Sequence, residues 1–99
     1  MLDRLTVEDF AALIGDAFGA PDGVTLELVA AEGLGPARSG PDGRALRAPY
    51  RLEWAGPPEP QLPSATVPLE HPSLGRLELF LGPVAREPDG SLRYEAVFG

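Results

Sequence analysis

Apolar and polar residues alternate most clearly in the C-terminal third of the chain. The densest apolar run lies within residues 70–86. Because successive side chains of a strand point to opposite faces, this run places three leucines on one face: Leu77, Leu79 and Leu81. The opposite face carries Phe80 and is also substantially apolar. A strand that is apolar on both faces is expected to be covered on both, by a helix or by another chain.

A second alternating run follows after a short polar interval. Its apolar positions share one face of a predicted strand: Leu92, Tyr94, Ala96 and Phe98. The interval Glu87–Ser91 contains Pro-Asp-Gly, a sequence typical of tight turns. We therefore predict that the two runs form a β-hairpin.

Three earlier segments also read as strands. Residues 24–31 and 50–54 alternate, and the second places Tyr50 and Trp54 on the inward face. A shorter segment at Thr66-Val67 is followed by Pro68, which lacks an amide hydrogen and confines this strand to an edge or to a brief pairing. Phe18 stands apart from these runs and is predicted to be an isolated apolar anchor.

A short helix is predicted near the N-terminus. Thr6 can cap it, and Asp9 is placed to return a hydrogen bond to the Thr6 amide. Phe10, Leu13 and Ile14 then follow at helical spacing, and Gly15 is a natural terminator. This predicts a helix of about two turns that needs packing to be stable and covers one end of the sheet with its apolar face.

Together these elements predict a mainly β protein, a small antiparallel barrel or sandwich of about five to six strands with one short N-terminal α-helix. Ninety-nine residues suffice for one domain, so we expect a single domain over residues 1–99. Gly and Pro contribute 12 residues each, which favours short strands joined by turns over a helical bundle.

Composition excludes several classes of chemistry. The chain contains no cysteine, so disulfides and thiolate-ligated metals are ruled out. All 8 basic residues are arginine, which removes lysine Schiff-base chemistry and a phosphate-loop lysine. With 15 acidic residues the net charge is −7, which argues against general binding of nucleic acid. We predict no enzymatic activity, no catalytic residue and no cofactor.

No stretch of about 18 apolar residues is present, so we expect no insertion into a membrane. The first residues do not resemble a signal peptide. We expect synthesis in the cytoplasm, with an extracellular or released assembly as the alternative location.

His71 is the only histidine and the first candidate for chemistry. Its neighbour Glu70 would point to the opposite face of a strand, and there is neither a cysteine nor a second histidine to complete a metal site. We therefore predict a turn residue whose imidazole bonds to the local backbone, and no metal site. The glycine-rich segment over residues 33–45 fails both phosphate-binding motifs at required positions and is predicted to be a loop.

Charge is unevenly distributed along the chain. Residues 36–51 hold four arginines and one acid, Asp42, which gives a local charge of +3 and leaves −10 on the rest of the chain. These arginines are Arg38, Arg44, Arg47 and Arg51. A basic segment on an acidic body suits contact with the acidic face of another copy or of an acidic partner; a solvated loop without a role is the alternative.

Several short motifs follow one another along the chain: Leu5-Thr6 with Asp9-Phe10 and Gly15, Tyr50-Arg51-Leu52, His71-Pro72 with Leu74-Gly75, Leu79-Phe80-Leu81 with Pro83, and Tyr94-Glu95-Ala96-Val97-Phe98. With them the chain resembles, over nearly its whole length, a family of small bacterial proteins known only as a domain of unknown function. The resemblance implies an association with phage-tail-collar-like proteins and thus with extracellular fibres or tail-like assemblies. It supplies no catalytic residue.

Two functions follow as hypotheses. The first is a structural or interaction protein that self-associates, as a homo-oligomer or as a subunit of a filament or phage-tail-like assembly. Its predicted interface residues are Arg38, Arg44, Arg47, Arg51, Phe80 and Phe98. The second is a small-ligand-binding barrel with Tyr50 and Trp54 near its mouth.

Overall fold

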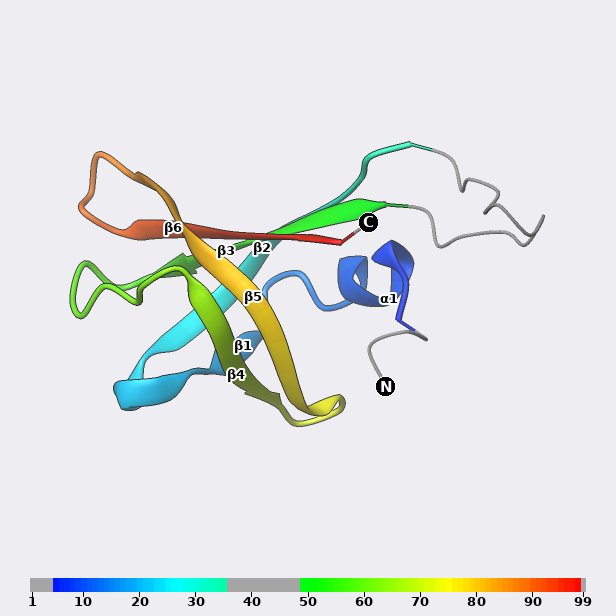
Figure 1. Ribbon diagram of the computed structural model, residues 1–99, viewed down its shortest axis with the longest axis horizontal. Helices are drawn as coiled ribbons and strands as arrows, with labels where there is room; N and C mark the ends of the chain where they lie inside the picture. Colours follow the sequence, from blue (N-terminus) through cyan, green and yellow to red (C-terminus); the bar gives the residue numbers. More distant parts are fainter. Residues whose placement is uncertain (1–4, 36–48, 99) are drawn as a thin grey trace.

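The computed structural model describes residues 5–35 and 49–98. In this part of the chain, six antiparallel strands close into a barrel in the order β1-β2-β3-β6-β5-β4, with one short helix, α1, beside it (Figure 1). The strands are β1 (Ala17–Gly19), β2 (Thr25–Gly33), β3 (Tyr50–Gly56), β4 (Ala65–His71), β5 (Gly75–Arg86) and β6 (Leu92–Phe98). The prediction of a small antiparallel barrel or sandwich with one N-terminal helix is confirmed, and of the two forms it is the barrel.

Alternation along the strands fills the barrel with large side chains. The predicted inward residues of β3, including Tyr50 and Trp54, are buried. Phe18 packs edge-on against Trp54, with ring centroids 6.0 Å apart. Tyr50 and Trp54 therefore belong to the packed core and do not line an open mouth.

The strand β1 was not predicted, although Phe18 at its centre was predicted to be an isolated apolar anchor. Phe18 is buried as expected, but it lies in a three-residue strand that pairs with β2. On its other side β1 meets β4 through a single pair, Gly19 with Glu70. Three residues are too few to show a period of two, so this strand leaves no pattern in the sequence.

β5 is the longest strand and pairs with two neighbours in succession. Residues 75–81 pair with β4, and Gly82 to Arg86 pair with β6. The register shifts between Pro83 and Ala85, so Val84 occupies a β-bulge. Along the chain β5 thus passes from β4 to β6 close to Gly82, and its residues before Gly82 are not paired with β6, which leaves a fork between the two strands.

The turn between β5 and β6 forms as predicted. Asp89 Oδ1 accepts hydrogen bonds from the hydroxyl and the amide of Ser91, at 2.7 and 2.9 Å. These bonds, the hydroxyl bond above all, lower the pKa of Asp89. Gly90 has a φ of 92°, a conformation that favours glycine.

On one of its two sides β4 has the brief pairing that was predicted from Pro68. It pairs with β5 along its whole length, whereas its strand pairing with β1 is limited to Glu70. A proline within the strand is tolerated where pairing on one side is this brief.

α1 (Val7–Ala11) begins as predicted and ends earlier. Thr6 and Asp9 form the expected capping box. The helix stops at Ala11, and Ile14, predicted on its buried face, is 48% exposed, so that prediction is wrong. The physical reason is that Gly15, with φ of 98°, turns the chain and its amide donates to Leu28 on β2.

Phe10 is the residue that anchors α1. It is fully buried, and its ring lies 6.0 Å from that of Tyr50 and 6.3 Å from that of Phe98. The helix therefore packs against β2 and β3 (Figure 1) and does not cover the outer face of β5. On that face Phe80 is 68% exposed, so α1 does not supply the expected cover, and cover by another chain stays a prediction.

No helix in the described ranges is long and apolar enough to cross a membrane.

Candidate interaction surface

Three exposed apolar side chains gather where β5 parts from β6. Phe80, Val84 and Val97 are 68, 54 and 59% exposed. They line one shallow hollow of about 300 Å³, which we call the β5–β6 hollow. Its lining residues are Ser64, Phe80, Gly82, Pro83, Val84, Glu95 and Val97.

The strand pattern explains how these side chains reach the surface. On β5 the leucines point inward, so Phe80 points outward. On β6 the buried face ends with Ala96, so Val97 points outward. Val84 lies at the bulge. Gly82 has no side chain, and the side chain of Ser64 lies where its Cβ would be.

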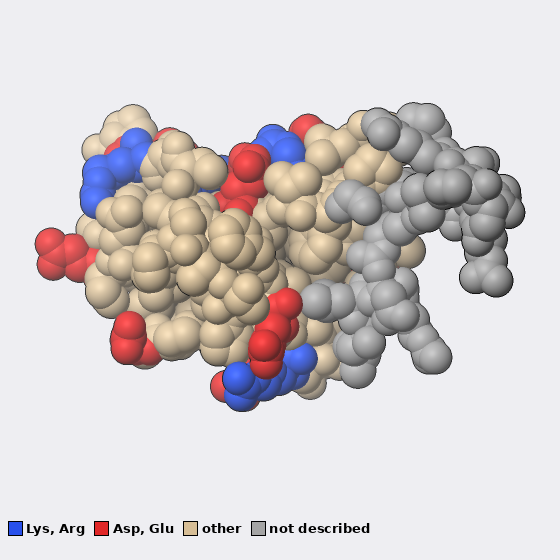
Figure 2. Space-filling view, viewed as in Figure 1, with Lys and Arg blue, Asp and Glu red and all other residues tan. Residues whose placement is uncertain are grey.

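The grouping distinguishes this surface from ordinary exposed apolar residues. Five large apolar side chains of the described residues are exposed, and three of them line this hollow. Apolar residues scattered singly over a surface are normal, whereas a contiguous group points to an interaction site. On the face drawn in Figure 2 the surface over the middle of β5 carries no charge, and charged side chains lie toward its margins.

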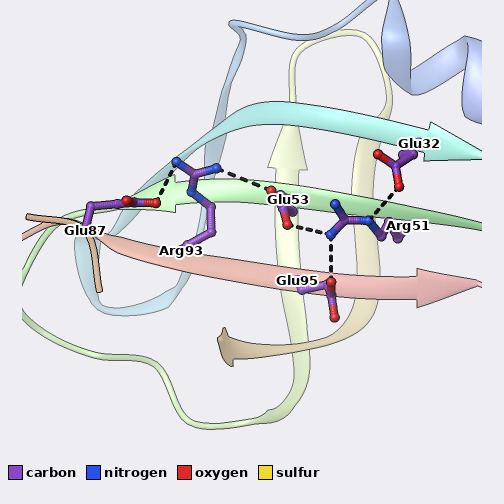
Figure 3. Close-up of polar contacts among 6 residues, drawn as sticks. All are labelled: Glu32, Arg51, Glu53, Glu87, Arg93 and Glu95. Carbon is purple, nitrogen blue, oxygen red and sulfur yellow. Dashed lines mark hydrogen bonds and ion pairs between the residues drawn. The ribbon is translucent and has the colours of Figure 1, made fainter. Parts of the chain in front are cut away.

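A network of ion pairs borders the hollow on the outer face of β2, β3 and β6 (Figure 3). Arg51 bonds to three carboxylates, those of Glu53 at 2.5 Å, Glu95 at 2.8 Å and Glu32 at 3.2 Å. These hydrogen bonds, first that of Glu53, raise the pKa of the Arg51 guanidinium still further above neutrality. Arg51 is thus the ion-pair partner of Glu95, the one charged residue that lines the hollow.

Arg93 extends the network toward the β5–β6 turn. Its guanidinium contacts Glu53 at 3.3 Å and Glu87 at 3.0 Å. Arg51 and Arg93 both contact Glu53. The network therefore joins carboxylates from β2, β3, β6 and the β5–β6 turn (Figure 3). Because Glu53 bonds to both arginines, the side chains of the network hold one another in place. We expect this to make the surface beside the hollow more rigid.

Comparison with known proteins places the chain in a family. Residues 5–98 match the family described as a domain of unknown function, DUF6916. The chain belongs to the DUF6916 family. No curated protein and no solved structure matches the chain. The resemblance noted in the sequence motifs is thus confirmed as far as membership of a domain-of-unknown-function family.

The predicted interface residues of this DUF6916 chain fall into three groups. Phe80 lies at the hollow. Arg51 lies beside it, engaged with carboxylates of its own chain. Phe98 stacks on Tyr50, with centroids 4.7 Å apart, and is partly buried. The remaining three lie outside the described residues: Arg38, Arg44 and Arg47.

Val84 and Val97 were not predicted as interface residues. Val97 could have been found, because it falls on the outward face of a run whose other outward residues are charged, Arg93 and Glu95. Val84 could not, because its direction depends on the bulge, which the sequence pattern does not reveal.

His71 is positioned by hydrogen bonds on both ring nitrogens. Nδ1 accepts from the amides of Ser73 and Leu74, at 3.0 and 3.3 Å, which confirms the predicted local bonding. Because Nδ1 accepts, Nε2 carries the hydrogen, and it donates to Asp16 Oδ2 at 2.8 Å. The side chain is buried, so neither nitrogen is presented to solvent. No group of three or more metal-ligating side chains occurs among residues 5–35 and 49–98.

Proposed function

We propose that this DUF6916 protein is a non-enzymatic structural module that self-associates, with the outer face of β5 and β6 as a contact surface. The observation that carries the proposal is the exposure of Phe80 beside an apolar hollow. Transferring apolar surface out of water is favourable by about 25 cal/mol per Å², so a surface of this kind gains free energy when a partner covers it.

The chemistry of the other candidate residues agrees with a role in binding. His71 has both nitrogens engaged in bonds that hold its turn, and the chain has no cysteine or lysine to act as a nucleophile. The bordering arginines are paired with carboxylates and stabilise the surface. These observations favour a docking surface over a reaction site.

A second contact, electrostatic instead of apolar, would allow more than two subunits to assemble. The segment of residues 36–51 carries +3 and the rest of the chain −10. Arg51 is already bonded to carboxylates of its own chain, so we propose that Arg38, Arg44 and Arg47 supply the attraction toward an acidic face of another copy. Two distinct contacts per subunit are what a filament or a tail-like assembly needs, and tail-collar-like proteins are the partners that the family resemblance suggests.

The direct test of self-association is the mass of the particle in solution. We expect light scattering to give a mass above one chain that rises with protein concentration. Phe80→Asp should lower that mass, because it puts a charge where the partner's apolar surface would lie. Ile14→Asp is the matched control, since Ile14 is also exposed and apolar but lies away from the hollow, and it should leave the mass unchanged. A wild-type protein that stays a single chain at high concentration contradicts the proposal.

The electrostatic contact has its own test. The double variant Arg44→Glu with Arg47→Glu reverses the charge of the basic segment, so we expect smaller particles at low salt and an unchanged fold. Raising the salt concentration should have the same effect on the wild-type protein, because screening weakens contacts between exposed charges. Particle size that is insensitive to both changes would remove this part of the proposal.

A further inference from the structure

We propose that the barrel opens at its β1–β4 junction when the ring of His71 takes up a second proton, so that this junction responds to mildly acidic pH. The proposal rests on the hydrogen bonds of His71 and does not depend on self-association. Histidine is the side chain that ordinarily changes its charge between about pH 5 and pH 8. The proton is therefore the ligand, and the β1–β4 junction is the part of the fold that it releases.

His71 lies where the closure of the barrel has the least support from strand pairing. It is the last residue of β4, and the residue before it, Glu70, forms the single strand pair that joins β4 to β1, with Gly19. The ring of His71 also contacts that of Phe18 on β1, with centroids 4.8 Å apart. A change at His71 therefore acts directly on this junction.

The local hydrogen bonds require a neutral ring at this position. Nδ1 accepts hydrogen bonds from the amides of Ser73 and Leu74, at 3.0 and 3.3 Å. In the charged imidazolium both ring nitrogens carry a hydrogen, so Nδ1 can no longer accept. A second proton would place a hydrogen on Nδ1 opposite two amide hydrogens. The ring can therefore be charged only if the turn over residues 72–74 moves away from it.

Burial of the ring acts in the same direction. The side chain of His71 is 4% exposed and packs against the apolar ring of Phe18. On β5 the residue paired with His71 is Gly75, which brings no side chain toward the ring. A charge on the ring would thus be removed from water, and burial disfavours the charged form of a histidine.

One charged group favours the charged ring, and its exposure limits the effect. Nε2 donates to Asp16 Oδ2 at 2.8 Å, but the Asp16 side chain is 48% exposed, so water and salt screen the attraction. Glu70 lies on the exposed face of β4, opposite Arg76 of β5. Among residues 5–35 and 49–98, Asp16 is the one charged group bonded to the ring. The two amide bonds and the burial of the ring outweigh this one screened attraction.

The opening is confined to the β1–β4 junction because the elements on either side have other partners. β1 keeps its three residue pairs with β2, and the backbone oxygen of Asp16 accepts from the Leu28 amide of β2 at 3.1 Å. β4 keeps its pairing with β5 along its whole length. Since the unfolded chain binds the second proton and the closed barrel does not, the closed barrel loses stability as the pH falls and regains it as the pH rises.

An NMR titration of the wild-type protein tests this mechanism. The chain has one histidine, so its ring signals are unique. Between about pH 7.5 and pH 5.5 we expect the signals of the ring, of the Ser73 and Leu74 amides and of the β1 amides to change together, with one midpoint. A ring that becomes charged while the Ser73, Leu74 and β1 amides keep their signals would overturn the proposal.

A variant with a side chain that does not titrate isolates the effect on stability. In His71→Asn the side-chain oxygen can take the place of Nδ1 and accept from the same two amides. A histidine in an unfolded chain has a pKa of about 6.5, so a closed barrel that rejects the proton has an unfolding equilibrium constant that rises about tenfold between about pH 7.5 and pH 5.5. We expect this rise, measured in urea by the fluorescence of Trp54, in the wild-type protein beyond whatever change the variant shows.

The two proteins share every carboxylate, so effects of acid on other groups are common to both. An equal response of the two proteins, or a wild-type protein that gains stability relative to His71→Asn as the pH falls, would overturn the proposal. The NMR titration uses the wild-type chain and gives its answer even if the variant does not fold.

Discussion

Replacing Phe10 by alanine is expected to lower the free energy of unfolding by about 3 to 5 kcal/mol, the usual cost of removing a buried phenylalanine. The Phe10 ring is fully buried and packs against those of Tyr50 and Phe98. A small domain has a total of about 5 to 10 kcal/mol, so this one change would remove a large part of its stability.

The loss should be large because α1 has little else to hold it. A helix of five residues is not stable alone, and Phe10 is its buried residue. When α1 loosens, the backbone oxygen of Leu5 also loses the hydrogen bond from the Tyr50 hydroxyl, which is 3.4 Å long. The ring of Phe98 would then become accessible to water on the side that Phe10 now covers.

Urea denaturation measures this effect with a probe that the chain already contains. Trp54 is the only tryptophan and is fully buried, so its fluorescence reports the unfolding of the core. Ile14→Ala is the control: it also truncates an apolar side chain near α1, but one that is 48% exposed, so we expect a change within about 0.5 kcal/mol. A loss below about 1 kcal/mol for Phe10→Ala would show that α1 does not depend on this contact.

The features that could be predicted from the sequence are those set by local patterns. Alternation identified the inward face of β3 and the leucine face of β5, because burial on one side of a strand imposes a period of two. The turn at Asp89 and the cap formed by Thr6 and Asp9 were predicted because each is completed within three residues. Such features depend on neighbours along the chain, and the sequence records those directly.

Features that depend on distant neighbours could not be predicted. The end of α1 at Ala11 is decided by pairing of the following segment with β2, which overrides the helical spacing of Ile14. The bulge at Val84 follows from the passage of β5 between two partner strands. Neither effect leaves a pattern in the segment where it occurs.

In the candidate site, too, features set by the local pattern could be predicted and features set by distant neighbours could not. Phe80 was predicted because an apolar residue on the outer face of a strand is visible in the alternation. Its grouping with Val84 and Val97 required the fork between β5 and β6. Arg51 was predicted as part of a basic contact surface, but carboxylates from β2, β3 and β6 surround it, and only the fold brings those strands together.

The second large effect is expected where the barrel closes. β1 and β4 share a single residue pair, Gly19 with Glu70, which makes this the weakest junction between neighbouring strands. His71 reinforces it from β4. Its Nε2 donates to Asp16, just before β1, and its ring lies 4.8 Å from that of Phe18 on β1.

His71→Ala is therefore expected to lower the free energy of unfolding by about 3 kcal/mol. The variant removes the acceptor for the amides of Ser73 and Leu74, and leaving partly buried donors without a partner costs about 1 to 3 kcal/mol. It also removes the contact with Phe18 at the junction. Urea denaturation followed by the fluorescence of Trp54 measures the loss.

Substitution of Asp16 separates the role of the hydrogen bond from that of an ion pair. Since Nδ1 accepts two hydrogen bonds, His71 holds its junction as a neutral ring, with its hydrogen on Nε2. Asp16→Asn keeps an oxygen that can accept this hydrogen, so we expect it to cost less than about 1 kcal/mol, whereas Asp16→Ala should cost about 1 kcal/mol or more. If Asp16→Asn were as damaging as His71→Ala, the closure of the barrel would depend on a charged histidine, and the assignment of the neutral ring would be wrong.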